Sequence, residues 1–275
     1  MERKLIRQGR NALTVTLPAR WLRERRLAAG KSVFLEEQND RLTITSARSA
    51  ATSSTTIDMT GAERSMVYHA VMGKYIEGFD RITVLHNCPN MMQEVGTRLL
   101  GMIIEEHGQT KTVYRSVIAV PEETFETVLR RAAHILLEQA RAVEALTLSS
   151  ATAEDVKDHE QLLDYNVLYC LRFLNKYERS APAYKYFLIC ATLEHAGDQL
   201  SRISRFIGRD KQLGAIVRKG IEEYTKILFT SDLKRMYTSL RAFRMSIPQK
   251  GFVHGIAYEM AETLYNYIGY LVQKE

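Results

Sequence analysis

The stretch ATLEHAGDQLSRI, residues 191–203, places two carboxylates in a run whose hydrophobic spacing is that of an amphipathic helix. Glu194 and Asp198 are four residues apart, so both side chains lie on the same face of that helix. Like charges in one place are unfavourable unless a cation or a basic partner compensates them. A single pair of this kind is most often a solvated or salt-bridged acidic stripe.

The same spacing recurs upstream, in HEQLLDYNVLYCL at residues 159–171, where Glu160 and Asp164 share one helix face. Two such pairs on neighbouring helices favour a common site over two unrelated acidic stripes. Carboxylate oxygens on facing helices are one way in which helical bundles hold hard metal ions. The repeated spacing therefore makes these four carboxylates candidate metal ligands.

The sequence around these stretches is helical from Pro121 to residue 275. Glycine and proline are scarce inside long runs with a 3.6-residue hydrophobic period, and short polar or proline-containing segments separate the runs. Short connections between helices favour an antiparallel bundle. The pattern predicts helices at about 122–148, 152–178, 182–208, 210–229, 232–246 and 253–273.

The two acidic segments, DHEQLLDYNVLYCLRFL (158–174) and LICATLEHAGDQLSRISRFI (188–207), resemble the PhoU fold, whose three-helix units carry acidic helices of this kind. The resemblance extends over residues 121–275 and implies a PhoU-like all-α antiparallel helix bundle. It also implies a divalent or iron-type metal ion, with iron, zinc or magnesium as the options. The implied ligands are Glu160, Asp164, Glu194 and Asp198.

The last predicted helix departs from the PhoU pattern. A full PhoU protein repeats both acidic motifs, but HGIAYEMAETLYNYIGYLV (254–272) carries Glu259, Glu262 and Asn266 without the four-residue spacing of two acids. We therefore expect one metal site or none, rather than a symmetric pair of metal clusters.

The net charge of +6 resides in the first fifth of the chain. Residues 1–50 hold eleven lysines and arginines against five acidic residues, whereas residues 51–275 are formally neutral. A local basic excess is typical of proteins that bind a phosphate backbone, and a solvated basic surface is the simpler alternative.

The basic segment has the pattern of a small β-rich domain. KLIRQ and ALTVTL alternate like strands around a GRN turn, Pro18 suits the first turn of a short helix, and SVFLEEQNDRLTITS has the pattern of two more strands. The short helix should separate charge from apolar surface, with Trp21 as a core anchor. The charged side should carry Arg20, Arg23 and Arg26, and the apolar side Leu17, Trp21 and Leu22.

Residues 2–46 resemble the AbrB/SpoVT-type swapped-hairpin DNA-binding domain, most specifically in LPARWL and RLAAGKSV. In that family two chains interleave their hairpins into one small β-barrel, and arginines contact double-stranded DNA. About 45 residues bury little core alone, which also favours a homodimer or higher homo-oligomer. The DNA-contacting positions that the resemblance implies are Arg3, Arg10, Arg20 and Arg23, with Arg7 as an addition.

Residues 55–120 alternate between strand and helix patterns, which predicts a small α/β unit. We expect strands at 55–60, 80–86 and 110–120 and helices at 61–78 and 89–108. The glycines form no phosphate-binding loop, so no nucleotide cradle is indicated. The predicted division is a DNA-binding domain at 1–47, a linker at 48–54, the α/β unit at 55–120 and the helical domain at 121–275.

These features predict a cytoplasmic protein without a transmembrane segment, since no long apolar run occurs. The two resemblances imply an archaeal-type phosphate-uptake regulator that binds DNA and senses a signal or partner through its helical body. The alternative is a PhoU-type adaptor that acts on a phosphate transporter or a signalling kinase without sequence-specific DNA binding. A metal-dependent hydrolase is the weakest reading, because no nucleophile–base constellation can be assembled, and we expect no enzyme and no catalytic residue.

Overall fold

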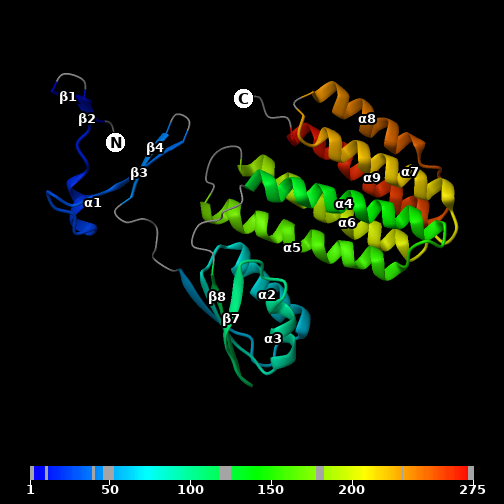
Figure 1. The fold of residues 1–275 in the computed structure, drawn as a ribbon, viewed down its shortest axis with the longest axis horizontal. Coiled ribbons are helices and arrows are strands. Elements are labelled where there is room, and N and C mark those ends of the chain that lie inside the picture. The colour runs from blue at the N-terminus through cyan, green and yellow to red at the C-terminus, as the bar shows by residue number, and fades with distance from the viewer. Residues whose placement is uncertain are drawn as a thin grey trace. The chain divides into compact units, whose positions relative to one another are not determined.

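The computed structural model describes residues 3–9, 12–38, 41–45, 53–117, 125–177, 183–230 and 232–271. The chain divides into two compact units, Met1–Ala51 and Thr52–Glu275, and each is considered by itself. The first is a small β-rich unit with one short helix, and the second combines a four-stranded sheet with a large helical body (Figure 1).

The first unit has the predicted order of strand, strand, helix, strand and strand. Its described strands form two separate antiparallel pairs, in which Arg7 lies opposite Leu13 and Leu35 lies opposite Ile44. The strands on either side of the predicted GRN and Gln-Asn-Asp turns are thus paired, and most of the turn residues lie outside the described residues. The elements are β1 (Ile6–Gln8), β2 (Ala12–Thr14), α1 (Ala19–Glu24), β3 (Phe34–Gln38) and β4 (Arg41–Thr45).

This unit has apolar side chains but no interior of its own. No side chain that the structure describes between residues 3 and 45 is buried. Large apolar side chains are instead 40–64% exposed. Because burial of apolar surface is the main driving force of folding, this unit needs another surface to cover it. The exposed residues are Leu5, Ile6, Leu13, Val15, Phe34, Leu35 and Leu42.

The second unit begins with a sheet of strand order β5-β6-β8-β7, in which β5 and β6 are parallel and the other pairs are antiparallel. Helices α2 and α3 pack against this sheet (Figure 1). Their buried side chains, including Tyr75 and Met92, share one core with it. The elements are β5 (Ser54–Asp58), α2 (Arg64–Ile76), β6 (Arg81–Leu85), α3 (Pro89–Gly96), β7 (Met102–His107) and β8 (Lys111–Ser116).

The helix expected at 89–108 is wrong in its second half. Helix α3 ends at Gly96, and β7 occupies 102–107. Gly101 has a φ of 77°, a left-handed conformation that glycine adopts without strain and that reverses the chain before the strand. The β-branched Ile103 and Ile104 then favour a strand, and pairing with β8 satisfies its backbone.

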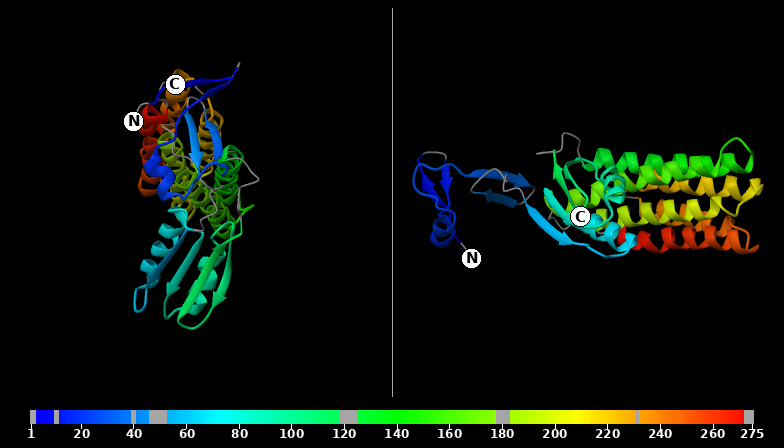
Figure 2. Two further views of the ribbon diagram at one scale, coloured as in Figure 1. Left: turned by 90° about the vertical axis from the view of Figure 1, so that its left-hand side faces the viewer. Right: turned by 90° about the horizontal axis from the view of Figure 1, so that it is seen from below.

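Among the described residues after 124, six helices form the body, and their boundaries lie within a few residues of those predicted. Side chains from all six helices contribute to one continuous apolar core, with α4 packed against α5, α6 and α7. Figure 2 shows these long helices lying side by side. They are α4 (Phe125–Thr147), α5 (Ala153–Tyr177), α6 (Ala183–Ser204), α7 (Lys211–Ile227), α8 (Leu233–Ser246) and α9 (Phe252–Leu271).

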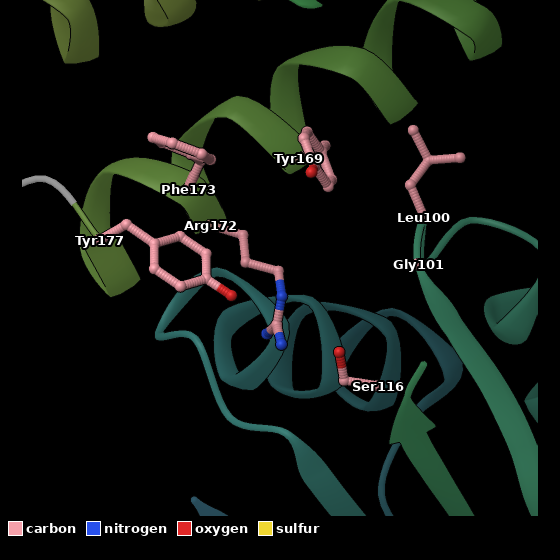
Figure 3. A pocket seen from close by; sticks show the side chains of 7 residues that line it. All are labelled: Leu100, Gly101, Ser116, Tyr169, Arg172, Phe173 and Tyr177. Carbon is pink, nitrogen blue, oxygen red and sulfur yellow. The ribbon is translucent and has the colours of Figure 1, made fainter. Parts of the chain in front are cut away.

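The α/β segment and the helical body are joined where α5 meets the C-terminal end of α2. The Arg172 guanidinium donates from Nη1 to the carbonyl oxygen of Tyr75 at 2.8 Å, and Asn175 donates to that of Ile76 at 3.0 Å. These two carbonyls are at the end of α2, where backbone acceptors lack the usual amide partner four residues on, and the Tyr75 carbonyl also accepts from the Gly78 amide at 3.0 Å. Lys176 adds an ion pair with Asp80. Figure 3 shows Arg172 reaching from α5 toward the α/β segment, beside Tyr177 and Ser116.

Candidate functional site

The two acidic pairs meet on the surface of the helical body. Glu160 and Asp164 are on α5, Glu194 and Asp198 are on α6, and the two helices pack against each other. Burial raises the pKa of Asp164 to about 7, and repulsion from Glu194, Glu160 and Asp198 adds to the increase. The structure therefore brings all four predicted carboxylates close enough to act on one another electrostatically. We call these four residues the acidic cluster.

A second member of the acidic cluster is also perturbed. The pKa of Glu194 is raised, first by partial desolvation among the packed helices and then by the charge of Asp198. Two carboxyl groups with raised pKa values mean that full ionisation of the cluster is unfavourable without a compensating cation.

Close helix packing at Gly197 places the two acidic pairs together. A β-carbon at this position would lie 2.5 Å from Leu163 Cδ2 and 3.3 Å from Gln139 Oε1. The first distance is too short for a methyl group, and the second is a tight contact. Glycine between Glu194 and Asp198 thus lets α6 approach α5 and α4 closely, and the acidic cluster depends on that approach.

A polar network behind the cluster holds one of its carboxylates. Ser201 donates to Glu160 Oε2 at 2.6 Å, and Gln139 donates from Nε2 to Ser201 Oγ at 3.1 Å and to the Gly197 carbonyl at 2.9 Å. Gln139 is fully buried. Sequence reasoning missed both residues. The available signals were Gln139 within an apolar stripe of α4, and Ser201 one helical turn beyond Asp198.

The α/β segment contributes a cation to the same place. Arg98 follows α3, and its charge pulls the pKa of Asp164 downward, against the effects of burial and the other carboxylates. Its guanidinium donates to the Tyr68 hydroxyl at 3.3 Å. The sequence pattern did not indicate that Arg98 would lie near the acidic cluster. It placed Arg98 within the helix expected at 89–108.

The donor set of the acidic cluster suits a hard metal ion, since carboxylate oxygens are the preferred ligands of such ions. In the part of the chain that the structure describes, however, no three His, Cys, Asp or Glu side chains converge as a metal-binding group. Binding a metal ion here would require the exposed carboxylates to rotate toward one another.

The predicted DNA-contacting residues lie on the first unit. Arg3 and Arg7 are exposed at β1, and Arg20 and Arg23 are exposed on α1. Arg10 lies outside the described residues. Arg20 Nε is 2.7 Å from Glu24 Oε1, but this pair is exposed and contributes little to stability. The two-sided character expected of α1 is present, because Leu17, Trp21 and Leu22 are partly buried.

The end of α1 carries an arginine in a conformation that usually requires glycine. Arg26 has a φ of 53° and its amide donates to the Arg23 carbonyl, while the Leu27 amide donates to the Leu22 carbonyl at 2.9 Å. This is a Schellman motif, which normally has glycine at the left-handed position. The motif ends α1 and leaves the Arg26 side chain exposed.

No family model, curated protein or solved structure matched this chain when it was compared with them. Within the described ranges, none of the helices has both the length and the apolar character needed to cross a lipid bilayer.

The raised pKa of Asp164 predicts a pH-dependent stability. Between the unfolded pKa of about 4 and the folded value of about 7, the native state holds a proton that the unfolded chain has lost. Stability should therefore fall as pH rises through this window. Asp164→Asn cannot titrate, so its free energy of unfolding should fall less over this pH range than that of the wild type. We expect the difference to be on the order of 1–3 kcal/mol, allowing for partial screening by solvent. Urea unfolding at pH 4.5 and 7.5 with a chelator present measures it.

Asp158→Asn is the matched control, because Asp158 is an exposed acid on the same helix. It should leave the pH dependence unchanged. Equal pH dependence in the wild type and in Asp164→Asn would contradict the perturbed state of this carboxyl.

Proposed function

We propose that this chain is a dimeric DNA-binding transcriptional regulator of phosphate uptake or homeostasis that acts in the cytoplasm. Its first unit would be an AbrB/SpoVT-like domain, and its helical body a PhoU-like bundle that senses a signal or binds a partner. One observation carries the proposal. The first unit holds the chain's basic excess, its strands expose apolar side chains, and none of its described side chains is buried.

Dimerisation would complete the first unit. The two described hairpins of the chain expose Leu13, Leu35 and Leu42. Interleaving the hairpins of two chains would bury these side chains and close a barrel, as in the swapped-hairpin family. Fully burying a leucine contributes roughly 1.5–3 kcal/mol, so several per chain suffice for a stable dimer.

We expect the full-length protein to sediment as a dimer at micromolar concentration, and Leu13→Glu/Leu35→Glu to weaken association by at least about a hundredfold. The reason is that each substitution would bury a charge in the barrel. Analytical ultracentrifugation measures the change. Leu148→Glu, at a side chain that is 54% exposed on the helical body, should leave sedimentation unchanged. A double variant that associates like the wild type would contradict the barrel dimer.

Two copies of the basic unit would present a twofold-symmetric positive surface. Arg20 and Arg23 lie on the exposed side of α1, and Arg3 and Arg7 lie at β1. Phosphate contacts from such a surface would fix the position of a DNA duplex, with few contacts left to read bases. The charge distribution supports this, because residues 51–275 are formally neutral.

Removing Arg20 and Arg23 as a double alanine variant should weaken binding to duplex DNA by at least about tenfold. It should also reduce the slope of log affinity against log salt by roughly 3–4, since a dimer loses four cations. Gel-shift titrations at several salt concentrations measure both effects. Glu24→Gln should strengthen binding, because it releases Arg20 from its ion pair.

Arg202→Ala/Arg205→Ala removes the same charge from exposed positions near the C-terminal end of α6 and should leave DNA affinity unchanged. Unaltered DNA binding by the Arg20/Arg23 variant would instead favour the adaptor that acts on a phosphate transporter or signalling kinase.

For the helical body, we propose a divalent or iron-type metal ion at Glu160, Asp164, Glu194 and Asp198. The support is electrostatic, because a cation would relieve the mutual repulsion of the acidic cluster. When bound, the metal would stabilise the ionised carboxylates and tie α5 to α6. The role would be structural or regulatory, and we propose no enzymatic activity.

Protein purified without chelator should contain roughly one metal ion per chain by elemental analysis, and Asp164→Ala/Asp198→Ala should lose it. Asp158→Ala, outside the cluster, should retain the metal. Equally negligible metal in the wild type and in the double variant would remove the metal site from the proposal.

A further inference from the structure

A groove of about 320 Å³ runs between α2 and α3 on the α/β segment. Arg64, Tyr68 and His69 of α2 line one side, and Glu94 of α3 and Arg98 line the other. Met91 and Val95 of α3 also line the groove but are almost fully buried, so the accessible lining consists of the polar side chains and the rings of Tyr68 and His69. The volume is that of a small-molecule site.

Arg98 is incompletely neutralised for its degree of burial. Its side chain is 23% exposed, its hydrogen bond to Tyr68 is to a neutral hydroxyl, and the oxygen of Glu94 with which it pairs is 4.0 Å away. Two other arginines provide a comparison. Arg218 is also 23% exposed and Arg244 is 21% exposed, but they contact carboxylates at 2.6 Å and 2.8 Å. The charge of Asp164 also acts on Arg98, but among the described residues the carboxylate within ion-pair distance of Arg98 is Glu94 at 4.0 Å, so Arg98 can take a closer anionic partner.

The rim of the groove adds a second cation. Arg64 Nη2 is 3.5 Å from Glu94 Oε2, so a single exposed carboxylate is shared between Arg64 and Arg98. That carboxylate side chain is 61% exposed and is free to turn into solvent. Two guanidinium groups around one displaceable carboxylate form a site for a ligand with two negative charges, and arginine pairs phosphate oxygens bidentately.

The rest of the groove suits a ligand with a ring or apolar body. The Tyr68 ring stands edge-on to His69 with centroids 5.5 Å apart, and the Arg98 guanidinium lies 5.4 Å from the Tyr68 ring centroid. A ligand body would rest against the accessible rings of Tyr68 and His69. A free phosphate ion would use the arginines and leave these rings uncovered.

We propose that the groove between α2 and α3 binds a phosphate-bearing small molecule, with the phosphate group at Arg98 and Arg64 and the ligand body against the rings of Tyr68 and His69. This deepens the proposed sensing role by naming the ligand class and the site, while the binding step itself does not depend on DNA binding.

The test is isothermal titration of the full-length protein with three probes: adenosine monophosphate, inorganic phosphate and adenosine. We expect the monophosphate to bind more tightly than inorganic phosphate, and adenosine to bind least. Arg98→Gln should weaken monophosphate binding by about tenfold or more, because a charge-assisted contact to a partly buried anion is lost. Glu94→Gln should strengthen it severalfold, and Arg98→Lys should restore part of the affinity.

Arg115→Gln is the matched control. Arg115 lies on β8 of the same α/β segment, pairs with Glu105 at 3.2 Å and does not line the groove. It should bind like the wild type. The proposal is overturned if neither phosphate probe binds at millimolar concentration, if adenosine binds as tightly as the monophosphate, or if Glu94→Gln fails to strengthen binding. DNA affinity without added ligand should be normal in Arg98→Gln, which separates a failure here from a failure of the DNA-binding proposal.

Discussion

The contact between Leu163 and Gly197 is the constraint on which the helical body depends. With no side chain on Gly197, α6 approaches α5 until Leu163 fills the space that a β-carbon would occupy. The approach sets the depth at which Asp164 is buried and the distance across which its neighbours repel it. It also brings the Gly197 carbonyl within reach of Gln139, so packing and polar networks are fixed by the same contact.

The helical body could be predicted closely from the sequence, because its signals are local. Hydrophobic periodicity and breakers set the six helices, and the spacing of Glu160 and Asp164, like that of Glu194 and Asp198, identified the acidic cluster before any tertiary information. The residues that surround the cluster could not be found in this way. Gln139 and Arg98 reach it through tertiary packing, and no pattern within α4 or α3 encodes which distant carboxylate a polar side chain will meet.

The wrong helix at 89–108 shows where local periodicity fails. Residues 102–107 could satisfy either a helical or a strand pattern, and pairing with β8 determined the outcome. The error concealed Arg98, because that residue was assigned to the middle of a helix rather than to the turn between α3 and β7. The first unit presents the opposite case. Its strands were predicted correctly, but local patterns carry no information about what covers Leu13 and Leu35.

The way α5 docks on α2 determines where this chain can be divided. Arg172 and Asn175 donate to backbone carbonyls at the end of α2. Separating the α/β segment from the bundle would remove these two hydrogen bonds and break the ion pair between Asp80 and Lys176. The two compact units of the chain divide between Ala51 and Thr52. The basic first unit is therefore the part that recombination or gene fusion would exchange, whereas the sheet and the helices are inherited as a single piece.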